Sequence, residues 1–237
     1  AGISGPMRLD RLIGNHSQYS QRSARLLIAQ GRVQVNAQVV RDARLDVDRF
    51  MMVSLDGEPL KMPTAAHYLM MNKPTGYLSA TSDAQHTTVM ALLPEELREL
   101  LHIGGRLDRN SSGLLILTND GLWSRRLTAP QVKIPKVYRI TTAEPISSDT
   151  ASRFAEGIYF AFENLTTSPA QLECLGPSEA RLSIYEGRYH QVKRMFHAVG
   201  NRVLTLHRES MGAIVLDPIL APGEYRPLTQ VEIDSIQ

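Results

Sequence analysis

Hydrophobic and polar positions alternate along most of the chain with the period of two that is typical of β-strands. The clearest strand is the aliphatic run Leu114 to Leu117, which is bounded by Gly113 and by the polar turn residues Thr118 to Gly121. The other predicted strands share short apolar or alternating patterns: Tyr68 to Asn72, Tyr77 to Thr81, Val137 to Thr142, Gln171 to Leu175, Ala180 to Tyr185 and Arg202 to His207.

Helical periodicity separates these strands. The predicted helices cover Val89 to Leu101, Leu122 to Leu127, Ser148 to Glu156, Tyr189 to Ala198 and a last segment near Gln230. We therefore predict an α+β fold from His67 onward, with a mixed, mostly antiparallel sheet flanked by helices.

The first sixty residues have a different pattern and form a unit of their own. Short helices are predicted within Met7 to Asn15 and within Ser20 to Gly31, where Ser20 is the expected N-cap and Gly31 ends the helix. Leu26 and Leu27 are expected to face the core. A β-hairpin should follow, because valines alternate in "RVQVNAQVV" on both sides of Asn36 and Ala37.

The stretch "KMPTAAH" is typical of a linker, so we predict domains at 7–66 and 67–237. The opening "AGISGP" has neither periodicity nor charge and is typical of an expression scar, which makes Met7 the expected native start. Apolar runs are far shorter than the roughly 20 residues that span a bilayer, and no signal-peptide pattern opens the chain. We expect a cytoplasmic monomer that does not bind a membrane.

Metal and cofactor patterns are missing from the sequence. The one cysteine, Cys174, excludes an internal disulfide and is expected to be a small packed side chain. No HExxH or HxH pair occurs among the seven histidines, and no GxGxxG, GxxxxGK[ST] or GxSxG is present. We therefore expect neither a metal nor a cofactor.

The net charge of +2 is small, but the charges are segregated along the chain. From His102 to Arg139, seven Lys or Arg against two Asp give +5, and from Arg188 to Arg208 five bases and no acid again give +5. Residues 140–187, with two bases and seven acids, carry −5, whereas nine bases and six acids give the first 66 residues +3. Basic surfaces built from distant segments favour an anionic partner, although solvated faces fit the same counts.

The segment "EGRYHQVKRMFHAVG" predicts a helix with one buried and one basic side. Tyr189, Val192, Phe196 and Val199 fall on one side, and His190, Lys193, Arg194 and His197 on the other. A solvated basic face is common. No Glu on the helix lies at i+4 to pair with these bases, which argues against a purely structural ladder of ion pairs.

The stretch "GGRLDRNSSGLLILTNDG" contains a single carboxylate, Asp108, between Arg106 and Arg109, on the loop that leads into the predicted strand at Leu114. Loops carried by rigid strands often present catalytic groups. An exposed ion pair of little energetic value is the alternative for such a short motif.

Four segments in this order, "NKPTGYLSAT", "HIGGRLDRNSSGLLILTNDG", "KVYRI" and "EGRYHQVKRMF", resemble the RNA pseudouridine synthases of the RsuA type, with an S4-like RNA-binding domain in front. The resemblance runs from Met7 to the end of the chain. It implies that Asp108 is the essential aspartate, that Tyr138 lies against the target base, and that Lys193 is the basic residue facing the aspartate. Ser111 stands where threonine is common, and Ala37 where S4 hairpins often have glycine, which makes a type I′ turn with positive φ doubtful there.

Without the resemblance, Tyr138 would be an ordinary strand tyrosine and Lys193 a solvated lysine. With it, we expect the isomerisation of a specific uridine of small-subunit (16S) ribosomal RNA, uridine 516, to pseudouridine. This chemistry needs no metal, and one carboxylate suffices as nucleophile or base, whereas glycoside hydrolysis uses two. Basic neighbours are expected to keep Asp108 ionised, and Arg106 to contact substrate.

The expected partner is ribosomal RNA or a small-subunit assembly intermediate, bound in part through phosphate contacts. The candidate RNA-contacting residues are Arg8, Arg22, Arg25, Arg32, Arg188, His190 and Arg194. Two alternatives stay open: a non-catalytic RNA-binding protein of ribosome assembly, and an RNA base glycosylase that would release uracil.

Overall fold

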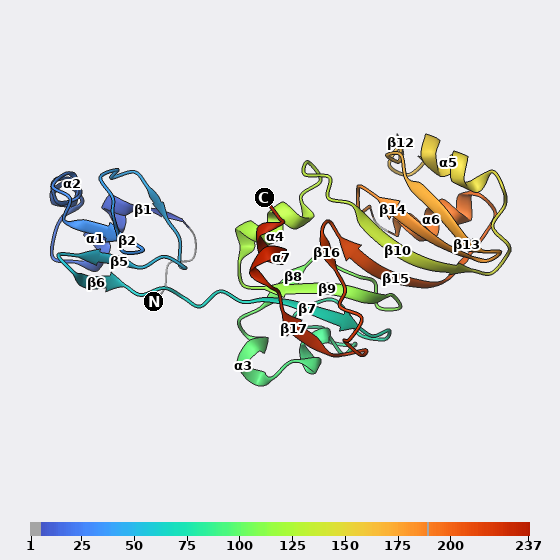
Figure 1. Ribbon diagram of the computed structural model, residues 1–237, viewed down its shortest axis with the longest axis horizontal. Helices are drawn as coiled ribbons and strands as arrows, with labels where there is room; N and C mark the ends of the chain where they lie inside the picture. Colours follow the sequence, from blue (N-terminus) through green and yellow to red (C-terminus); the bar gives the residue numbers. More distant parts are fainter. Residues whose placement is uncertain (1–5, 189) are drawn as a thin grey trace. The chain divides into compact units, whose positions relative to one another are not determined.

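The computed structural model describes residues 6–188 and 190–237, and the chain divides into two compact units, one ending at Ala66 and the other beginning at His67 (Figure 1). The first unit consists of β1 (Met7–Arg8), α1 (Leu9–His16), α2 (Gln21–Ala29), β2 (Val33–Val35), β3 (Gln38–Val39), β4 (Asp46–Val47), β5 (Val53–Leu55) and β6 (Glu58–Lys61). Its main sheet is antiparallel in the order β3-β2-β5-β6.

Helix α2 forms as predicted, except that one of its leucines does not face the core. Ser20 is the N-cap and its hydroxyl accepts a hydrogen bond from the backbone of Ser23 at 3.1 Å. Leu27 and Ile28 are buried, but Leu26 is 64% exposed, so its predicted place in the core is wrong. Three consecutive residues span about 200° around the axis of a helix, so only two of these three apolar side chains face the core.

The hairpin between β2 and β3 turns at Asn36 and Ala37, both with positive φ, +50° and +66°. The doubt about a positive φ at Ala37 is therefore wrong. Asn36 fixes the turn because its side-chain oxygen accepts a hydrogen bond from the backbone of Met52 at 3.0 Å. Ala37 consequently occupies a conformation that glycine would adopt without a Cβ penalty.

The second unit contains a long sheet with helices packed against it. Its strands are β7 (Tyr68–Lys73), β8 (His102–Gly104), β9 (Ser112–Thr118), β10 (Lys136–Thr142), β11 (Tyr159–Phe160), β12 (Leu165–Thr166), β13 (Gln171–Gly176), β14 (Glu179–Ile184), β15 (Val203–Met211), β16 (Ile214–Val215) and β17 (Tyr225–Pro227). Its helices are the 3₁₀-helix η1 (Val89–Leu92), α3 (Glu95–Arg98), α4 (Gly121–Thr128), α5 (Thr150–Glu156), α6 (Gln191–Ala198) and α7 (Gln230–Asp234).

The sheet runs in the order β13-β14-β10-β15-β9-β7-β17, and every pairing along it is antiparallel except that of β9 with β15. The predicted mixed, mostly antiparallel sheet is confirmed. The parallel pairing is short, His207 with Ser112 and Arg208 with Gly113, and it joins the two halves of the sheet. The chain enters β9 at this junction, directly after the Asp108 loop.

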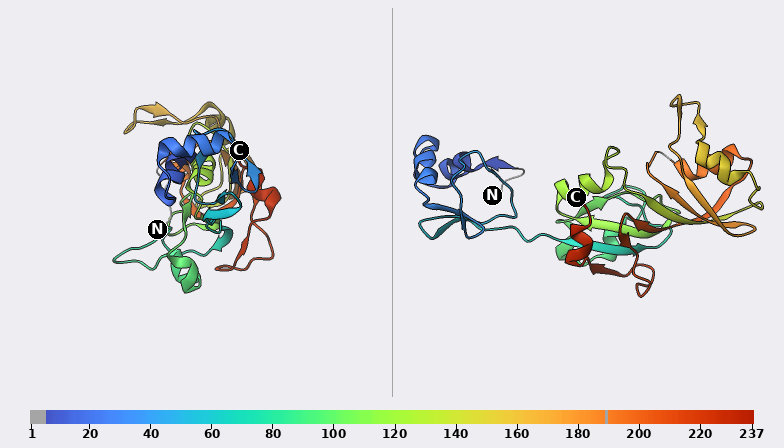
Figure 2. Two further views of the ribbon diagram at one scale, coloured as in Figure 1. Left: turned by 90° about the vertical axis from the view of Figure 1, so that its left-hand side faces the viewer. Right: turned by 45° about the horizontal axis from the view of Figure 1, so that its top comes forward.

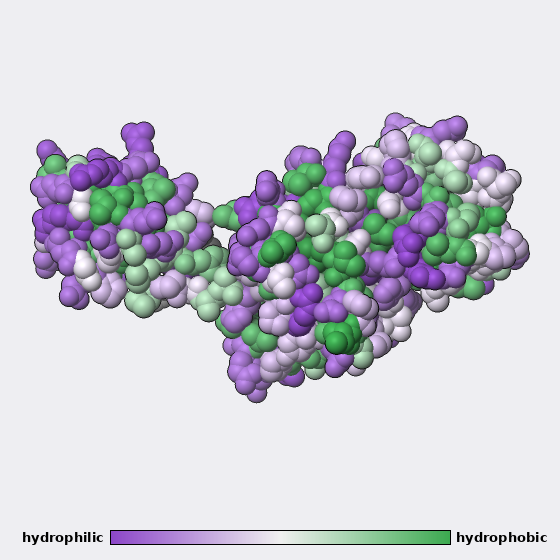
Figure 3. All heavy atoms as spheres, viewed as in Figure 1, coloured by the Kyte–Doolittle hydropathy of each residue, from purple (hydrophilic) through white to green (hydrophobic). Residues whose placement is uncertain are grey.

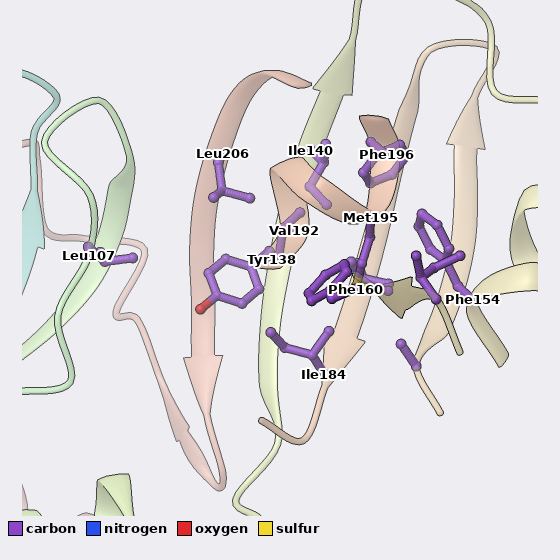
Figure 4. Close-up of a cluster of buried hydrophobic side chains, with 13 residues drawn as sticks. Leu107, Tyr138, Ile140, Phe154, Phe160, Ile184, Val192, Met195, Phe196 and Leu206 are labelled. Atoms are coloured by element: carbon purple, nitrogen blue, oxygen red, sulfur yellow. The ribbon is translucent and has the colours of Figure 1, made fainter. Parts of the chain in front are cut away.

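Strand β9 is buried on both faces, which explains its unbroken aliphatic sequence. Leu114 and Ile116 pack with Trp123 of α4 on one face, whereas Leu115 and Leu117 pack with residues near η1 on the other. In the other half of the sheet, α5 and α6 cover β10, β14 and β15, as the close-up in Figure 4 illustrates. The two helices meet through Phe154 and Phe196, whose rings are edge to face at 5.0 Å.

Some predicted elements differ from the structure. Tyr77 to Thr81 forms only a single bridge, Leu78 with Thr88. The helix predicted over Val89 to Leu101 is broken into η1 and α3, because Pro94 is in an extended conformation and lacks an amide hydrogen.

Cys174 is exposed on β13 rather than packed. Tyr189 lies outside the described residues. Within the described part of the chain, no helix is long and apolar enough to span a bilayer.

Candidate active site

The loop between β8 and β9 carries Asp108, and a buried lysine holds its backbone. Lys73, at the end of β7, is completely buried, and its ammonium donates hydrogen bonds to the carbonyl oxygens of Ser111 at 2.7 Å, Pro74 at 3.0 Å and Arg109 at 3.2 Å. Two of these carbonyls, those of Arg109 and Ser111, follow Asp108 closely in sequence. Lys73 therefore fixes the conformation of the loop without contacting the space in front of the carboxylate.

Burial lowers the pKa of Lys73 to about 8, and the nearby charge of Asp108 opposes this shift only in part. The sequence analysis assigned no role to Lys73. A lysine at the end of a strand and before a proline is usually a turn residue, and no local pattern marks it as buried. Its role emerges only from the pairing of β7 with β9.

A second buried cation holds the other side of the loop. Arg208 of β15 is 1% exposed, and its guanidinium donates hydrogen bonds to the carbonyl oxygens of Gly105 at 2.8 Å, Leu114 at 2.9 Å and Arg106 at 3.4 Å. Gly113 permits the close pairing of β9 with β15, since a Cβ atom there would lie 2.3 Å from the backbone carbonyl oxygen of Arg208. Buried side-chain donors from β7 and β15 thus hold the backbone of the Asp108 loop from two sides.

The carboxylate of Asp108 faces α6. Its Oδ2 lies 3.5 Å from Nε2 of His190 and 3.9 Å from Nζ of Lys193. The predicted proximity of Lys193 to Asp108, across 85 residues of sequence, is therefore observed. His190 precedes α6 with φ +47°, a left-handed conformation that is uncommon for a non-glycine residue and directs the chain into the helix.

Asp108 opens into a pocket of about 660 Å³, which is also lined by Arg106, Tyr138 and Lys193. The structure therefore brings all the predicted catalytic and substrate-contacting residues together. The side chain of Asp108 is 40% exposed, so a ligand can reach it. Tyr138 is 7% exposed and lines the pocket, and in Figure 4 its ring lies beside Val192 and Ile184 within the hydrophobic cluster. The core and binding-site interpretations of Tyr138 are thus compatible.

The arginines beside Asp108 in sequence do not pair with it. Within the described residues, the basic partners of Asp108 are His190 and Lys193, whereas Arg109 donates to the backbone of Gly76 at 3.3 Å. Arg106 and Arg109 both line the pocket, where their charges are available to an anionic ligand. The ordinary exposed ion pair, which was the alternative for this motif, is therefore not formed by Arg106 or Arg109.

A further cation in this pocket was not predicted from the sequence. Lys136, at the start of β10, lines it. Burial and the positive charge of Arg208 lower the pKa of Lys136, and Glu186 offsets this only in part. The alternation of "KVYRI" gives a signal, since it predicts Lys136 and Tyr138 on one face of a strand.

Among the candidate RNA contacts in the first unit, most arginines pair with acids. Arg8 and Arg25 both contact the buried Asp10, at 2.9 and 3.0 Å, and Arg32 pairs with Asp56 at 2.6 Å. In the described part of the chain Arg22 forms no ion pair, and it is exposed.

In the second unit, Arg188 pairs with Glu186 at 3.1 Å and Arg194 with Glu163 at 2.5 Å. The guanidinium of Arg194 also lies 3.8 Å above the ring of Phe160. The lack of acids on α6 itself was correctly identified, but it did not exclude ion pairs, because the acids come from other elements. Among the described residues, no three His, Cys, Asp or Glu side chains gather as a metal site requires.

Comparison with known proteins gives a consistent result. Residues 67–198 match the family model of the RNA pseudouridylate synthases. The chain is 54% identical to ribosomal small subunit pseudouridine synthase A of Pseudomonas aeruginosa and 46% identical to the protein of that name from Escherichia coli K12, each over 97% of this chain and 100% of the relative. A crystal structure of a pseudouridylate synthase, 38% identical, superposes with a TM-score of 0.72 over 98% of this chain and 100% of the other.

Proposed function

The chain belongs to the RNA pseudouridine synthase family, enzymes that isomerise uridine to pseudouridine, and we propose that its substrate is a specific uridine of small-subunit (16S) ribosomal RNA, uridine 516. The observation that carries the proposal is the reachable Asp108 carboxylate, which faces Lys193 in a pocket lined by cations. The names of the near full-length relatives support ribosomal RNA as the substrate.

In this reaction the bond from N1 of uracil to C1′ of the ribose breaks and a bond from C5 to C1′ forms, while C5 loses a proton and N1 gains one. Asp108 serves either as the nucleophile at the sugar or as the base. The ammonium of Lys193 lies 3.9 Å from its Oδ2. The target base leaves its stack to reach the pocket, where the ring of Tyr138 lies against it.

The glycosylase alternative is less favourable because the second carboxylate that lines the pocket already accepts hydrogen bonds from neighbouring residues. Glu186 also lines the pocket, but its carboxylate accepts hydrogen bonds from the backbone of Ser168 at 2.7 Å, from Gln191 at 3.0 Å and from Arg188 at 3.1 Å. Hydrolysis needs an acid and a base across the bond. Asp108 is therefore the carboxylate that is available for chemistry.

The first unit acts in this proposal as an S4-like RNA-binding domain. Its helix pair and hairpin present Arg22 and the outer sides of Arg8 and Arg25, which are 42% and 54% exposed although both contact Asp10. The partner is ribosomal RNA or a small-subunit assembly intermediate, and the enzyme works as a cytoplasmic monomer without a cofactor.

A product assay on 16S ribosomal RNA tests the function. A synthase converts one uridine into an isomer of unchanged mass, a glycosylase releases free uracil, and a non-catalytic binding protein leaves the RNA unmodified. Mapping pseudouridine in cells with and without the protein identifies the position. Modification of a different position would contradict uridine 516, and release of uracil would contradict the synthase.

A further inference from the structure

A second pocket, of about 490 Å³, adjoins the catalytic pocket, and His190 and Lys193 line both. Its walls come from α6, from the hairpin of β11 and β12, and from the start of β15. In Figure 2 this hairpin projects from the body of the unit. Because the pockets share Lys193, a chain-like ligand can occupy both at once.

The second pocket is lined by cations and by no acid. Lys193, Arg194 and Arg202 line it together with His190 and His197. Glu163 neutralises Arg194 from outside the lining. Arg202 is exposed and forms no ion pair within residues 6–188 and 190–237, so its charge is available to an anion. The remaining charge is complementary to phosphate.

Exposed aromatic rings accompany these cations. Tyr159 lines the pocket with 59% of its surface exposed, and its hydroxyl donates a hydrogen bond to the side chain of Asn164 at 2.7 Å, which holds the ring in place. Phe162, in the same hairpin, is 95% exposed. On the face visible in Figure 3, hydrophobic residues lie among hydrophilic ones at this end of the unit. Cations beside exposed rings are typical of surfaces that bind single-stranded nucleic acid, since phosphates pair with the cations and bases stack on the rings.

We propose that this second pocket binds a nucleotide of single-stranded RNA next to the target uridine, with Arg202 and His197 facing its phosphate and Tyr159 stacking on its base. Naming the RNA strand rests on the proposed function, whereas the pocket, its charge and its rings are independent of it. Continuity with the catalytic pocket identifies the ligand as the flanking strand of the substrate, because a separate small anion would need no aromatic wall.

Binding of oligouridylate of about nine nucleotides to Asp108→Asn protein tests the pocket without turnover. Tyr159→Ala is expected to weaken binding roughly tenfold, because a stacked base is lost. Tyr159→Phe keeps the ring but loses its hydrogen bond to Asn164, so its affinity should lie between those of the parent protein and Tyr159→Ala. Arg202→Gln should reduce the slope of log affinity against log salt by about 0.7, the value for one phosphate on a single strand. Arg98→Gln on α3, which lines neither pocket, is the matched control for loss of one charge.

An abasic ribose-phosphate oligomer separates stacking from misfolding. Tyr159→Ala and the parent protein should bind this oligomer equally, since it has no base to stack. The proposal is overturned if Tyr159→Ala and Arg202→Gln bind oligouridylate with the affinity and salt slope of the Arg98→Gln control. It is also overturned if Tyr159→Ala weakens both oligomers to the same extent.

Turnover on a 16S ribosomal RNA transcript distinguishes this inference from the proposed function. With Asp108 intact, Tyr159→Ala should raise KM roughly tenfold and leave kcat unchanged, because the lost contact is remote from the reacting atoms. If the parent enzyme makes no pseudouridine while the oligouridylate effects persist, the function fails and the pocket stands. If turnover is normal and the variants bind like the control, the pocket fails and the function stands.

Discussion

The tetrapeptide Arg-Leu-Asp-Arg occurs twice in this chain, at 8–11 and at 106–109, and the two copies have opposite fates. In the first unit Asp10 is completely buried and hydrogen-bonded to Arg8 and Arg25 at 2.9 and 3.0 Å. In the second unit Asp108 is 40% exposed, and its basic neighbours His190 and Lys193 lie farther away, at 3.5 and 3.9 Å. Both copies bury their leucine, so the difference concerns the charged residues.

The backbone around each tetrapeptide explains this difference. Asp10 lies in the first turn of α1, where the backbone amide of Arg11 also donates to it at 2.8 Å. Burial alone raises the pKa of Asp10, but hydrogen bonds from Arg25, Gln21, Arg11 and Arg8 more than offset this and lower it. Around Asp108, the buried Lys73 and Arg208 bind the loop backbone and leave the carboxylate to the pocket. A fully hydrogen-bonded acid stabilises the fold. An acid whose backbone is held in place and whose carboxylate faces a pocket is suited to catalysis.

The largest effect is expected at the open acid. Asp108→Asn should reduce pseudouridine formation to below detection and leave RNA affinity nearly intact, because an amide keeps the shape but is neither nucleophile nor base. Single-turnover product analysis and RNA binding of the same preparation measure both. Substantial turnover by this variant would contradict the catalytic role of Asp108.

Removing the cation behind the loop comes next. Lys73→Met should lower kcat roughly a hundredfold, since loss of three carbonyl contacts lets the loop shift and a displacement of about 1 Å is costly to catalysis. Steady-state kinetics with circular dichroism as a control for folding measures this. Unchanged kcat in a folded variant would show that the loop needs no such anchor.

The pH dependence of stability gives an independent check of Lys73. Its pKa is about 8 in the folded chain and 10.5 as a free side chain, so between these values the unfolded chain binds one more proton than the folded chain. The free energy of unfolding of the natural protein should therefore rise relative to that of Lys73→Met as pH increases from about 8 to 10.5, by up to about 3 kcal/mol. A difference that does not vary with pH would contradict the burial of a charged Lys73.

A smaller effect is expected at the cation in front of the acid. Lys193→Met should lower activity by up to roughly tenfold, because the ion pair is half-exposed and partly screened by solvent. Lys193→Arg should be mild, since the charge survives. Equal loss of activity in both variants would argue against an electrostatic role.

The smallest effect concerns the strained turn of the first unit. Ala37→Gly should stabilise this unit by about 1 kcal/mol, because Ala37 has φ +66° and glycine adopts that conformation without a Cβ penalty. Hydrogen exchange of the β2 and β5 amides should slow about fivefold. Ala29→Gly at the end of α2 is the control and should have the opposite sign. Faster exchange in Ala37→Gly would show that the turn is not strained.

The sequence predicted the elements whose pattern is local. The run Leu114 to Leu117 marked β9, and the predicted stripe of α6 put Lys193 on the side that meets Asp108. Contacts between distant segments were not predictable in the same way. Lys73 and Arg208 are ordinary basic residues in sequence, and only the pairing of β7 and β15 with β9 turns them into buried donors to one loop. The prediction that Leu26 faces the core was wrong because one of three consecutive apolar residues on a helix points away from the core.

The most direct test of the account is a side-by-side measurement of Asp10→Asn and Asp108→Asn, with unfolding and single-turnover pseudouridine formation followed in the same preparations. Asp10→Asn should destabilise the first unit by roughly 2 kcal/mol, because Arg8 and Arg25 lose a charged partner, and it should keep the chemical rate of the folded enzyme. Asp108→Asn should keep the stability and lose the chemistry. Loss of chemistry in Asp10→Asn with normal folding, or normal chemistry in Asp108→Asn, would contradict the division of the two tetrapeptides into a structural and a catalytic acid.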